Sequence, residues 1–347
     1  MADQGRIKNI TELAQLAGVS AGTVSRALAN SELISKKTRD RVQALAREHD
    51  FRPNIMARNL RIKRAGAIGV VIPLGHETAQ HISDPFFMTL IGYLADALTE
   101  RGHDLLLSRV IPTHHDWLIN VVDSGRVDGV ILIGQSDQSE VIDKVAGRYL
   151  PLVAWGAQMA GQVHCSVGSD NRKGGELAAR HLIERGVKRF AFFGDPIAPE
   201  IAERLEGCRA ELARAGLAHA LEILPAHLTA ETAHPAIAEW LTGIKRAGIN
   251  KTGISTVPDG IIAASDVIAL SALRALAEQG FAVPSDVKVI GYDDLPLANQ
   301  TLPPLTTIRQ DLVAGAAHLV DLLFRRIGGE KAASVVLEPK LIIRGSS

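Results

Sequence analysis

Residues 17–26, Ala-Gly-Val-Ser-Ala-Gly-Thr-Val-Ser-Arg, read as a helix end, a tight turn and the start of a second helix. Before the turn, apolar residues recur at the i, i+3, i+4, i+7 spacing of one buried helical face: Ile10, Leu13, Ala14 and Ala17. Gly18 is suited to end this helix, because glycine adopts the left-handed conformation at low cost. Ser20 can cap the next helix by accepting a hydrogen bond from the amide of Thr23. The stretch therefore predicts two helices joined by a short turn.

A third helix is predicted to begin after Ser35, which can cap it, and to turn Val42, Leu45 and Ala46 inward. Three short helices of this kind bury one small core and leave the second helix protruding. This arrangement is typical of a helix-turn-helix DNA-binding domain.

Positive charge is concentrated in the same part of the chain. Residues 1–64 contain 13 Lys or Arg and 6 Asp or Glu, a net charge of +7. The whole chain balances at 38 basic and 38 acidic residues, so the remainder carries −7. A basic head on an acidic body favours phosphate contact at one end only. A charged protein-binding domain is the alternative.

Short motifs spread over residues 9–60 are similar to those of a known family. They read Ile10-Thr11-Glu12-Leu13-Ala14, Ala17-Gly18-Val19-Ser20, Thr23-Val24-Ser25-Arg26, Thr38-Arg39 and Arg52-Pro53-Asn54. On these motifs the chain resembles the lactose-repressor/galactose-repressor family of bacterial transcription regulators. The resemblance implies a DNA-binding regulator that responds to a small ligand.

The resemblance also implies which residues meet DNA. These are Thr11, Ser20, Ala21, Gly22, Thr23, Ser25, Arg26, Asn30, Arg58 and Leu60. Arg26 is expected to contact a base, in the bidentate geometry that suits guanine, whereas Thr23 and Ser25 are expected to contact phosphate or the helix end. Ala21 and Gly22 depart from relatives with larger polar side chains. Because these two offer only a methyl group and a close backbone approach, specificity must depend on Arg26, the backbone or DNA shape.

Residues 52–65 are predicted to form a hinge. Pro53 can start a helix of about two turns, which alone would be marginally stable in water. The resemblance implies that this helix folds in the DNA minor groove, where Leu60 wedges between base pairs and kinks the duplex. A flexible linker with Leu60 packed on the body is the alternative.

Residues 66–347 alternate short apolar runs with helical patterns. Strands are predicted at 67–73, 104–108, 129–133, 152–155, 189–193, 221–224, 260–263 and 287–292. Helices are predicted near 86–101, 114–124, 138–147, 172–185, 199–215, 230–243 and 266–279. This alternation predicts parallel sheets covered on both faces, with a cleft at the carboxyl ends of the strands.

The fold class predicted is a small all-α helix-turn-helix head plus an α/β body with two parallel sheets. The resemblance implies that the body is bilobed, like the periplasmic sugar-binding proteins (type I). We expect the head at 1–51, the hinge helix and linker at 52–65, and an effector-binding and dimerisation domain at 66–347. The first lobe is expected at about 66–168 and 302–328, and the second at about 169–297 and 331–347.

Five residues are candidates for ligand binding, on positions that match the family's site: Phe86, Trp155, Arg204, Asp266 and Asp293. Carboxylates and a guanidinium suit polyol recognition, because sugar hydroxyls both donate and accept hydrogen bonds. Phe86 and Trp155 could stack against a sugar face. Each has a structural alternative: Asp266 could cap a helix beginning at Val267, Asp293 could hold a turn, and an aromatic residue could be core.

No cofactor and no metal site are expected. The loose group of His76, His81, His114 and His115 lacks a ligand spacing. No G-x-G-x-x-G, Walker loop, H-E-x-x-H or nucleophile elbow occurs, so an enzyme is not predicted. Cys165 and Cys208, the chain's two cysteines, are expected to be buried thiols rather than a disulfide.

The sequence thus predicts a cytoplasmic, homodimeric, sequence-specific repressor of sugar-utilisation genes. Its partners are a near-palindromic double-stranded DNA operator and a small effector, expected to be a sugar bound between the two lobes. No signal peptide and no membrane span are found in the sequence. A sugar-binding receptor module without DNA function is the alternative, although it would leave the basic head unused.

Overall fold

The structure is a computed structural model that describes residues 7, 9–51, 64–75, 78–135 and 137–247, and residues 257–347. The chain divides into two compact units, residues 1–65 and 66–347, which are treated separately below. Most of the expected hinge, including Arg58 and Leu60, lies outside the described residues.

The head contains three short helices: α1 (Ile10–Ala17), α2 (Ala21–Leu28) and α3 (Lys36–Glu48). Their core is made of small and aliphatic side chains together with Phe51, and Leu13, Val24 and Val42 are fully buried. The caps predicted from the sequence are confirmed: Gly18 has a φ of 62° after α1, and Ser20 and Ser35 accept amide hydrogen bonds at the starts of α2 and α3.

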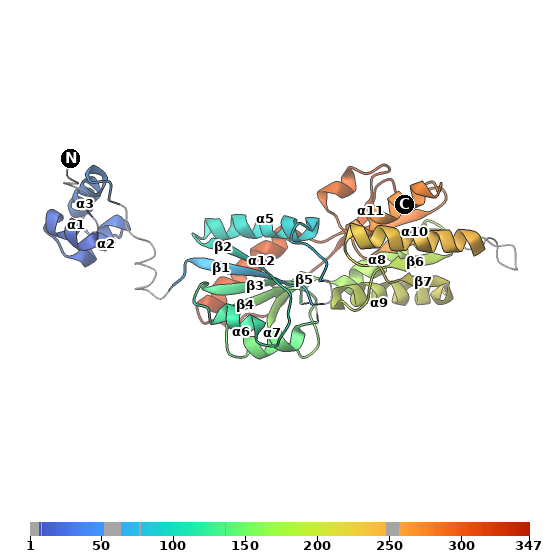
Figure 1. Cartoon of the computed structure of the whole chain (residues 1–347), viewed down its shortest axis with the longest axis horizontal. Helices are drawn as coiled ribbons and strands as arrows, with labels where there is room; N and C mark the ends of the chain where they lie inside the picture. The colour runs from blue at the N-terminus through green and yellow to red at the C-terminus, as the bar shows by residue number, and fades with distance from the viewer. Residues whose placement is uncertain (1–6, 8, 52–63, 76–77, 136, 248–256) are drawn as a thin grey trace. The chain divides into compact units, whose positions relative to one another are not determined.

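The first sheet of the body has the strand order β11-β5-β4-β3-β1-β2. Its strands are β1 (Ala67–Pro73), β2 (Asp104–Val110), β3 (Gly129–Ile133), β4 (Leu152–Trp155), β5 (Cys165–Ser169) and β11 (Val335–Leu337). All of its pairs are parallel. Helices α5 (Pro85–Glu100) and α12 (Leu312–Ile327) pack on one face, and α6 (Trp117–Val122) and α7 (Ser139–Ala146) pack on the other (Figure 1).

The second sheet has the order β12-β10-β9-β8-β6-β7. Its strands are β6 (Phe190–Phe193), β7 (Leu221–Leu224), β8 (Gly260–Ala263), β9 (Lys288–Asp293), β10 (Thr306–Arg309) and β12 (Lys340–Ile342). Its helices are α8 (Asn171–Glu184), α9 (Pro199–Arg214), α10 (Ala230–Ala247) and α11 (Asp266–Glu278). Helix α8 packs with α9 and α10 packs with α11, the two pairs on opposite sides of the sheet (Figure 1). Short 3-10 turns lie at Ala218–Ala220 and Pro296–Asn299.

Two expectations for the body need correction. β12 runs antiparallel to β10, so the second sheet is mixed rather than purely parallel. The late segments also divide differently between the two lobes. β10 pairs with β9 in the second sheet, although 302–328 was expected in the first lobe. β11 pairs with β5 in the first sheet, although 331–347 was expected in the second lobe. The chain therefore crosses between the sheets at 169–171, 309–312 and 337–340, and only α12 of the segment 302–328 covers the first sheet.

Both cysteines are free and buried, as predicted. Burial raises the pKa of the Cys208 thiol, which donates a hydrogen bond to the carbonyl of Gly175. In the part of the chain that the structure describes, no helix is long and apolar enough to cross a membrane.

Candidate DNA-binding face and ligand-binding cavity

Helix α2 turns one face to the head's core and leaves the other open. Val24 and Ala27 are buried, whereas the side chain of Arg26 is exposed. Gly22 lies one turn before Arg26, and a Cβ placed there would be 3.8 Å from Nη2 of Arg26. The small residues Ala21 and Gly22 therefore leave the guanidinium accessible along the start of α2.

Several of the other predicted DNA contacts have structural roles as well. Ser20 Oγ accepts the amide of Thr23 at 3.1 Å and lies 2.9 Å from the hydroxyl of Thr23, so this pair closes the start of α2. Asn30 has a φ of 55° and accepts a hydrogen bond from Gln43 Nε2 at 2.6 Å. Thr11 is exposed in the first turn of α1, and Ser25 is half-buried on α2.

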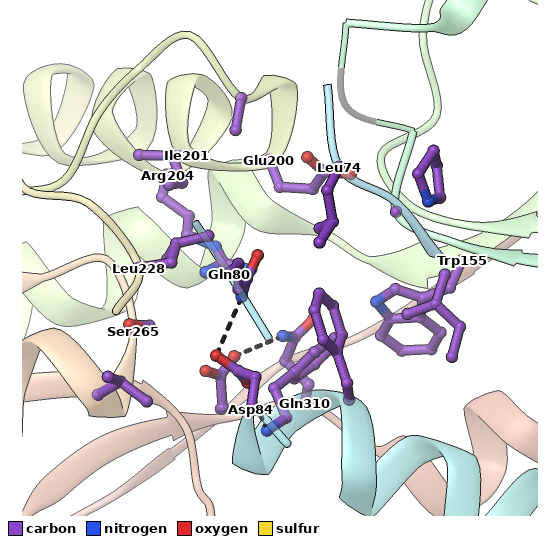
Figure 2. A pocket seen from close by; sticks show the side chains of 18 residues that line it. Leu74, Gln80, Asp84, Trp155, Glu200, Ile201, Arg204, Leu228, Ser265 and Gln310 are labelled. Atoms are coloured by element: carbon purple, nitrogen blue, oxygen red, sulfur yellow. Dashed lines mark hydrogen bonds between the residues drawn. The ribbon is translucent and has the colours of Figure 1, made fainter. Parts of the chain in front are cut away.

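Within the body, a cavity of about 120 Å³ lies between the carboxyl ends of the two sheets; we call it the inner cavity (Figure 2). Its lining residues are Pro73, Leu74, Gln80, Asp84, Phe86, Phe87, Ile133, Gly134, Trp155, Ala198, Glu200, Ile201, Arg204, Leu228, Ser265, Val267, Asp293 and Gln310. They come from both lobes, because strand ends β1, β3 and β4 contribute on one side, and α9, α11 and β9 on the other. A molecule bound here would therefore contact both lobes at once.

Aromatic side chains form one wall of the inner cavity. Trp155 ends β4, and Phe86 lies in the first turn of α5, with ring centres 6.3 Å apart. Phe87 is buried beside them, 6.1 Å from Phe86. Trp155 packs closely on α12, since a Cβ on Gly315 would lie 2.3 Å from its Cζ3 atom. The wall presents apolar ring surfaces that are inclined to one another, by 53° between Phe86 and Trp155.

Two carboxylate–amide pairs form the polar part of the cavity. Gln310 Nε2 donates to Asp293 Oδ1 at 2.7 Å, and Gln80 Nε2 donates to Asp84 Oδ2 at 3.0 Å (Figure 2). Gln80 is fixed in turn by Arg109, whose guanidinium donates to the Gln80 and Thr78 carbonyls. Each pair provides both donor and acceptor atoms within reach of the cavity.

Arg204 is immobilised by its neighbours. Its Nε donates to Asn171 Oδ1 at 2.9 Å, and its Nη1 donates to the Ala264 carbonyl at 2.5 Å. Helix α9 can bring Arg204 here because its backbone packs directly against that of α8. A Cβ on Gly175 would lie 1.9 Å from the carbonyl oxygen of Arg204. A Cβ on Gly207 would lie 1.9 Å from the carbonyl oxygen of Arg172.

The turn after β9 directs two neighbouring aspartates to different partners. Asp293 and Asp294 have φ values of 115° and 56°, which are unfavourable for residues with a side chain. The surroundings hold them there: Asp293 binds Gln310, while Asp294 accepts hydrogen bonds from Arg309 and Arg344, each at 2.6 Å.

Burial changes the acidity of this region. It raises the pKa of Asp293 to about 7, against the opposing effects of Arg204 and Gln310. Burial likewise raises the pKa of Asp84, opposed by its hydrogen bond from Gln80, and raises that of Asp266 well above its ordinary value. The inner cavity therefore contains one carboxyl group, that of Asp293, which can be protonated near neutral pH and can then also donate a hydrogen bond.

Comparisons with known proteins identify the family. The description "Bacterial regulatory proteins, lacI family" matches residues 9–54, and "Periplasmic binding protein-like domain" matches residues 179–347. The HTH-type transcriptional regulator CelR of Thermobifida fusca is 30% identical, over 99% of both chains. This chain belongs to the LacI family. The resemblance is confirmed, and so is the predicted fold class, apart from the one antiparallel strand β12.

Other LacI-family proteins are similar over nearly the full length. The HTH-type transcriptional regulator DegA of Bacillus subtilis is 30% identical over 97% of both chains. Among solved structures, a lac repressor dimer bound to operator and the anti-inducer ONPF has a TM-score of 0.81 at 25% identity, covering 98% of this chain and 99% of that one. A complex of CelR with cellobiose has a TM-score of 0.67 at 30% identity, covering 98% and 100%. These relatives are transcriptional regulators rather than enzymes, as the sequence predicted for this chain.

Four of the five ligand-binding candidates line the inner cavity of this LacI-family chain: Phe86, Trp155, Arg204 and Asp293. Asp266 does not. Its carboxylate is fully buried and accepts hydrogen bonds from the Leu295 amide at 2.7 Å and the Thr307 hydroxyl at 2.6 Å. A Cβ on Gly291 would lie 2.2 Å from its Oδ1. Asp266 therefore braces β9 and β10 instead of facing the cavity.

The alternatives proposed for the aspartates also change. Ser265, not Asp266, caps α11, and Ser265 rather than Asp266 lines the cavity. Asp170 accepts the amide of Lys173 as the N-cap of α8.

Sequence reasoning missed five polar lining residues: Gln80, Asp84, Glu200, Ser265 and Gln310. Asp84 had a signal, because Asp84-Pro85 starts a helix beside the predicted Phe86. Gln310 had none, since it lies where the chain crosses between sheets and its proximity to Asp293 depends on the tertiary fold. Among the described residues, no group of three or more His, Cys, Asp or Glu is arranged to hold a metal ion.

Proposed function

We propose that this LacI-family chain is a homodimeric transcriptional repressor whose affinity for a near-palindromic operator is controlled by a neutral sugar bound in the inner cavity. The genes it controls would be those of sugar utilisation, and it would act in the cytoplasm. Domain 1–51 would bind DNA, 52–65 would form the hinge, and 66–347 would bind the effector and dimerise.

The head supports the DNA-binding part of the proposal. Its three-helix core leaves α2 protruding with Arg26 exposed, the geometry of a recognition helix that enters the major groove. Residues 1–64 carry a net charge of +7, which favours phosphate contact and an affinity that falls with salt. Arg26 would make the principal base contact. Contacts with the DNA backbone would come from Thr11, Ser20, Thr23 and Ser25.

The inner cavity carries the proposal for the ligand. An aromatic wall made by Phe86 and Trp155 lies beside carboxylate–amide pairs that can both donate and accept hydrogen bonds. Aromatic stacking with mixed hydrogen bonding suits a sugar, which has an apolar ring face and hydroxyls at its edge. The lining contains three acidic side chains, Asp84, Glu200 and Asp293, and one basic side chain, Arg204. This excess of acidic groups disfavours sugar phosphates and sugar acids.

Similar proteins support the same class of effector and the same assembly. The solved relatives include CelR in complex with cellobiose, an Enterococcus faecium LacI-family regulator with bound ribose, and the lac repressor dimer on its operator. In this chain a sugar would contact Asp84 and Trp155 in one lobe and Arg204 and Asp293 in the other. It would therefore stabilise one relation of the lobes and change operator affinity by population shift.

The test begins by selecting operator sequences with the purified full chain from a random double-stranded DNA library. We expect two-fold symmetric sites. Thermal unfolding is then screened against monosaccharides, disaccharides, sugar phosphates and purines, because a ligand that binds only the folded state adds about 2.7 kcal/mol of stability at 100 times its Kd.

We expect a sugar to raise the Tm, Asp293→Ala to abolish the shift, and that sugar to change affinity for the selected DNA. Asp104→Ala, an exposed carboxylate outside the cavity lining, is the control. Failure to select any DNA site would overturn the regulator, whereas a shift only with purines or phosphorylated compounds would overturn the ligand class.

A further inference from the structure

A second cavity of about 360 Å³ adjoins the inner cavity. It is lined by Gln80, His81, Ser83, Asp84, Pro85, Leu228, Thr229, Ala230, Glu231, His234, Val267, Leu270, Ser271, Arg274 and Leu297. The loop before α5 forms one side, and the starts of α10 and α11 form the other. Like the inner cavity, it is bounded by both lobes.

The two cavities have four lining residues in common: Gln80, Asp84, Leu228 and Val267. Figure 2 shows Leu228 on the side of the inner cavity opposite Trp155, with Gln80 between them. The Gln80–Asp84 pair therefore lies at the boundary between the inner cavity, with its aromatic wall, and the second cavity. A ligand stacked on Trp155 can extend in that direction.

Size indicates that the inner cavity does not hold the whole ligand. Small-molecule sites typically measure about 300–1,000 Å³. The inner cavity alone, at about 120 Å³, is smaller than this, and the second cavity adds about 360 Å³.

The second cavity is polar, and its lining includes the carboxyl groups of Asp84 and Glu231 and the guanidinium of Arg274. The hydroxyls of Thr229 and Ser271 lie in buried residues of its wall. His234 Nε2 and Arg274 Nε both bond to Glu278, each at 2.8 Å, so the imidazole and the guanidinium share one carboxylate. Hydroxyl, imidazole and paired guanidinium groups suit an uncharged polyhydroxylated group better than a phosphate, which would need unpaired cations.

We propose that the second cavity is a binding subsite for the second sugar unit of a neutral disaccharide or longer glycoside, whose first unit stacks on Trp155 in the inner cavity. This inference rests on the proposed function and specifies its effector. The Gln80–Asp84 pair, which borders both cavities, would face the linkage between the two units. A monosaccharide would fill only the inner cavity and bind more weakly.

The test compares matched sugars by isothermal titration calorimetry on the full-length protein: glucose with cellobiose and maltose, galactose with lactose, and xylose with xylobiose. We expect at least one disaccharide to bind with a Kd tenfold or more below that of its parent monosaccharide, a difference of about 1.4 kcal/mol.

A blocking variant tests the place of binding. Ala230 is exposed at the start of α10 and lines only the second of the two cavities, so Ala230→Trp can fill this space without disturbing the core. We expect it to bring the disaccharide's Kd to within threefold of the monosaccharide's, leaving the latter unchanged. Arg274→Ala, which removes a polar wall group, should weaken the disaccharide alone. Glu239→Trp, exposed on the same helix and outside the lining of either cavity, is the matched control and should change neither.

The possible failures are distinguishable. If monosaccharides bind as tightly as every matched disaccharide, or if Ala230→Trp weakens both equally, the second subsite is wrong and the sugar-controlled repressor stands. If no sugar of either size binds, the proposed ligand class is wrong, and the subsite with it.

Discussion

The guanidinium carbon of Arg204 lies 3.7 Å from the centre of the Tyr292 ring, so that cation and ring stack in a buried wall of the inner cavity. Tyr292 belongs to β9, and its pKa is raised to about 12 by burial, so it remains neutral beneath the cation. Asn171, from the crossover into α8, completes the arrangement by accepting the Nε hydrogen bond. Arg204 thus joins α8, α9 and β9 at the ligand's side of the second lobe.

Replacing Arg204 by lysine should weaken sugar binding at least tenfold. A lysine keeps the charge but loses the planar stack, and it cannot donate to Asn171 and the Ala264 carbonyl in the same fork. Calorimetry with the sugar found in the thermal screen measures the effect. Arg209→Lys, an exposed change on the same helix, is the control, and equal affinity in the two variants would contradict a role for Arg204 in ligand binding.

Gly175→Ala should lower the free energy of unfolding of the body by about 1–3 kcal/mol, the usual cost of overpacking. Its new Cβ would lie 1.9 Å from the Arg204 carbonyl oxygen, so α9 must move away from α8. Urea unfolding followed by tryptophan fluorescence measures this, because Trp117, Trp155 and Trp240 all lie in the body. The same displacement should weaken sugar binding.

The control for this change is Gly243→Ala in α10. Gly243 is exposed within a helix and has open space around the position of a Cβ, so alanine should raise stability by up to about 1 kcal/mol. A gain of stability in Gly175→Ala, like that expected in Gly243→Ala, would show that the α8–α9 contact does not depend on glycine.

The head was predictable because its signals are local. A cap such as Ser20 and its partner Thr23 are three residues apart, and the apolar spacing of α1 describes its own buried face. The long apolar strands of the body were likewise found, since Ala67–Pro73 and Gly129–Ile133 are nearly continuous buried runs.

What the sequence did not reveal depends on contacts between distant segments. β5 reads Cys-Ser-Val-Gly-Ser, too small and polar to be recognised as a strand, although it is buried between β4 and β11. β10, β11 and β12 are three or four residues long and are stabilised only by their sheet partners. Asp266 was misassigned for the same reason: its partners Leu295 and Thr307 are 29 and 41 residues away.

The contribution of Asp293 to the stability of the body should fall as the pH rises from about 4 to 7, whereas carboxyl groups whose pKa is lowered in the fold, such as that of Asp259, contribute in the opposite direction. The folded-state pKa of Asp293 is raised to about 7, above an unfolded value near 3.9, so protonation favours the fold. That contribution is complete below the unfolded pKa and is lost as pH rises through the folded one, at up to about 1.36 kcal/mol per pH unit. Urea unfolding across this range measures it.

Asp293→Asn should remove part of this dependence, so that the variant gains stability relative to the native protein as pH rises. Part remains because burial also raises the pKa values of Asp84 and Asp266. Asp104→Asn, an exposed carboxylate, should leave the profile unchanged. A parallel pair of profiles for Asp293→Asn and the native protein would refute the assignment to Asp293.

Arg26→Ala should reduce affinity for the selected operator by about 1–3 kcal/mol, the discrimination expected from one bidentate base contact. The loss should be small on unrelated DNA, and the slope of log K against log salt should hardly change, because a base contact releases no phosphate counterion. If Arg26 contacted a phosphate, its loss would instead weaken binding to all sequences alike and reduce the salt slope by about one.

Arg47→Ala, which removes the same charge from an exposed position in the last turn of α3, controls for the head's net charge. Fluorescence anisotropy on both DNAs at several salt concentrations therefore decides which contact Arg26 makes, and an unchanged sugar response in Arg26→Ala would place DNA and ligand recognition in separate units.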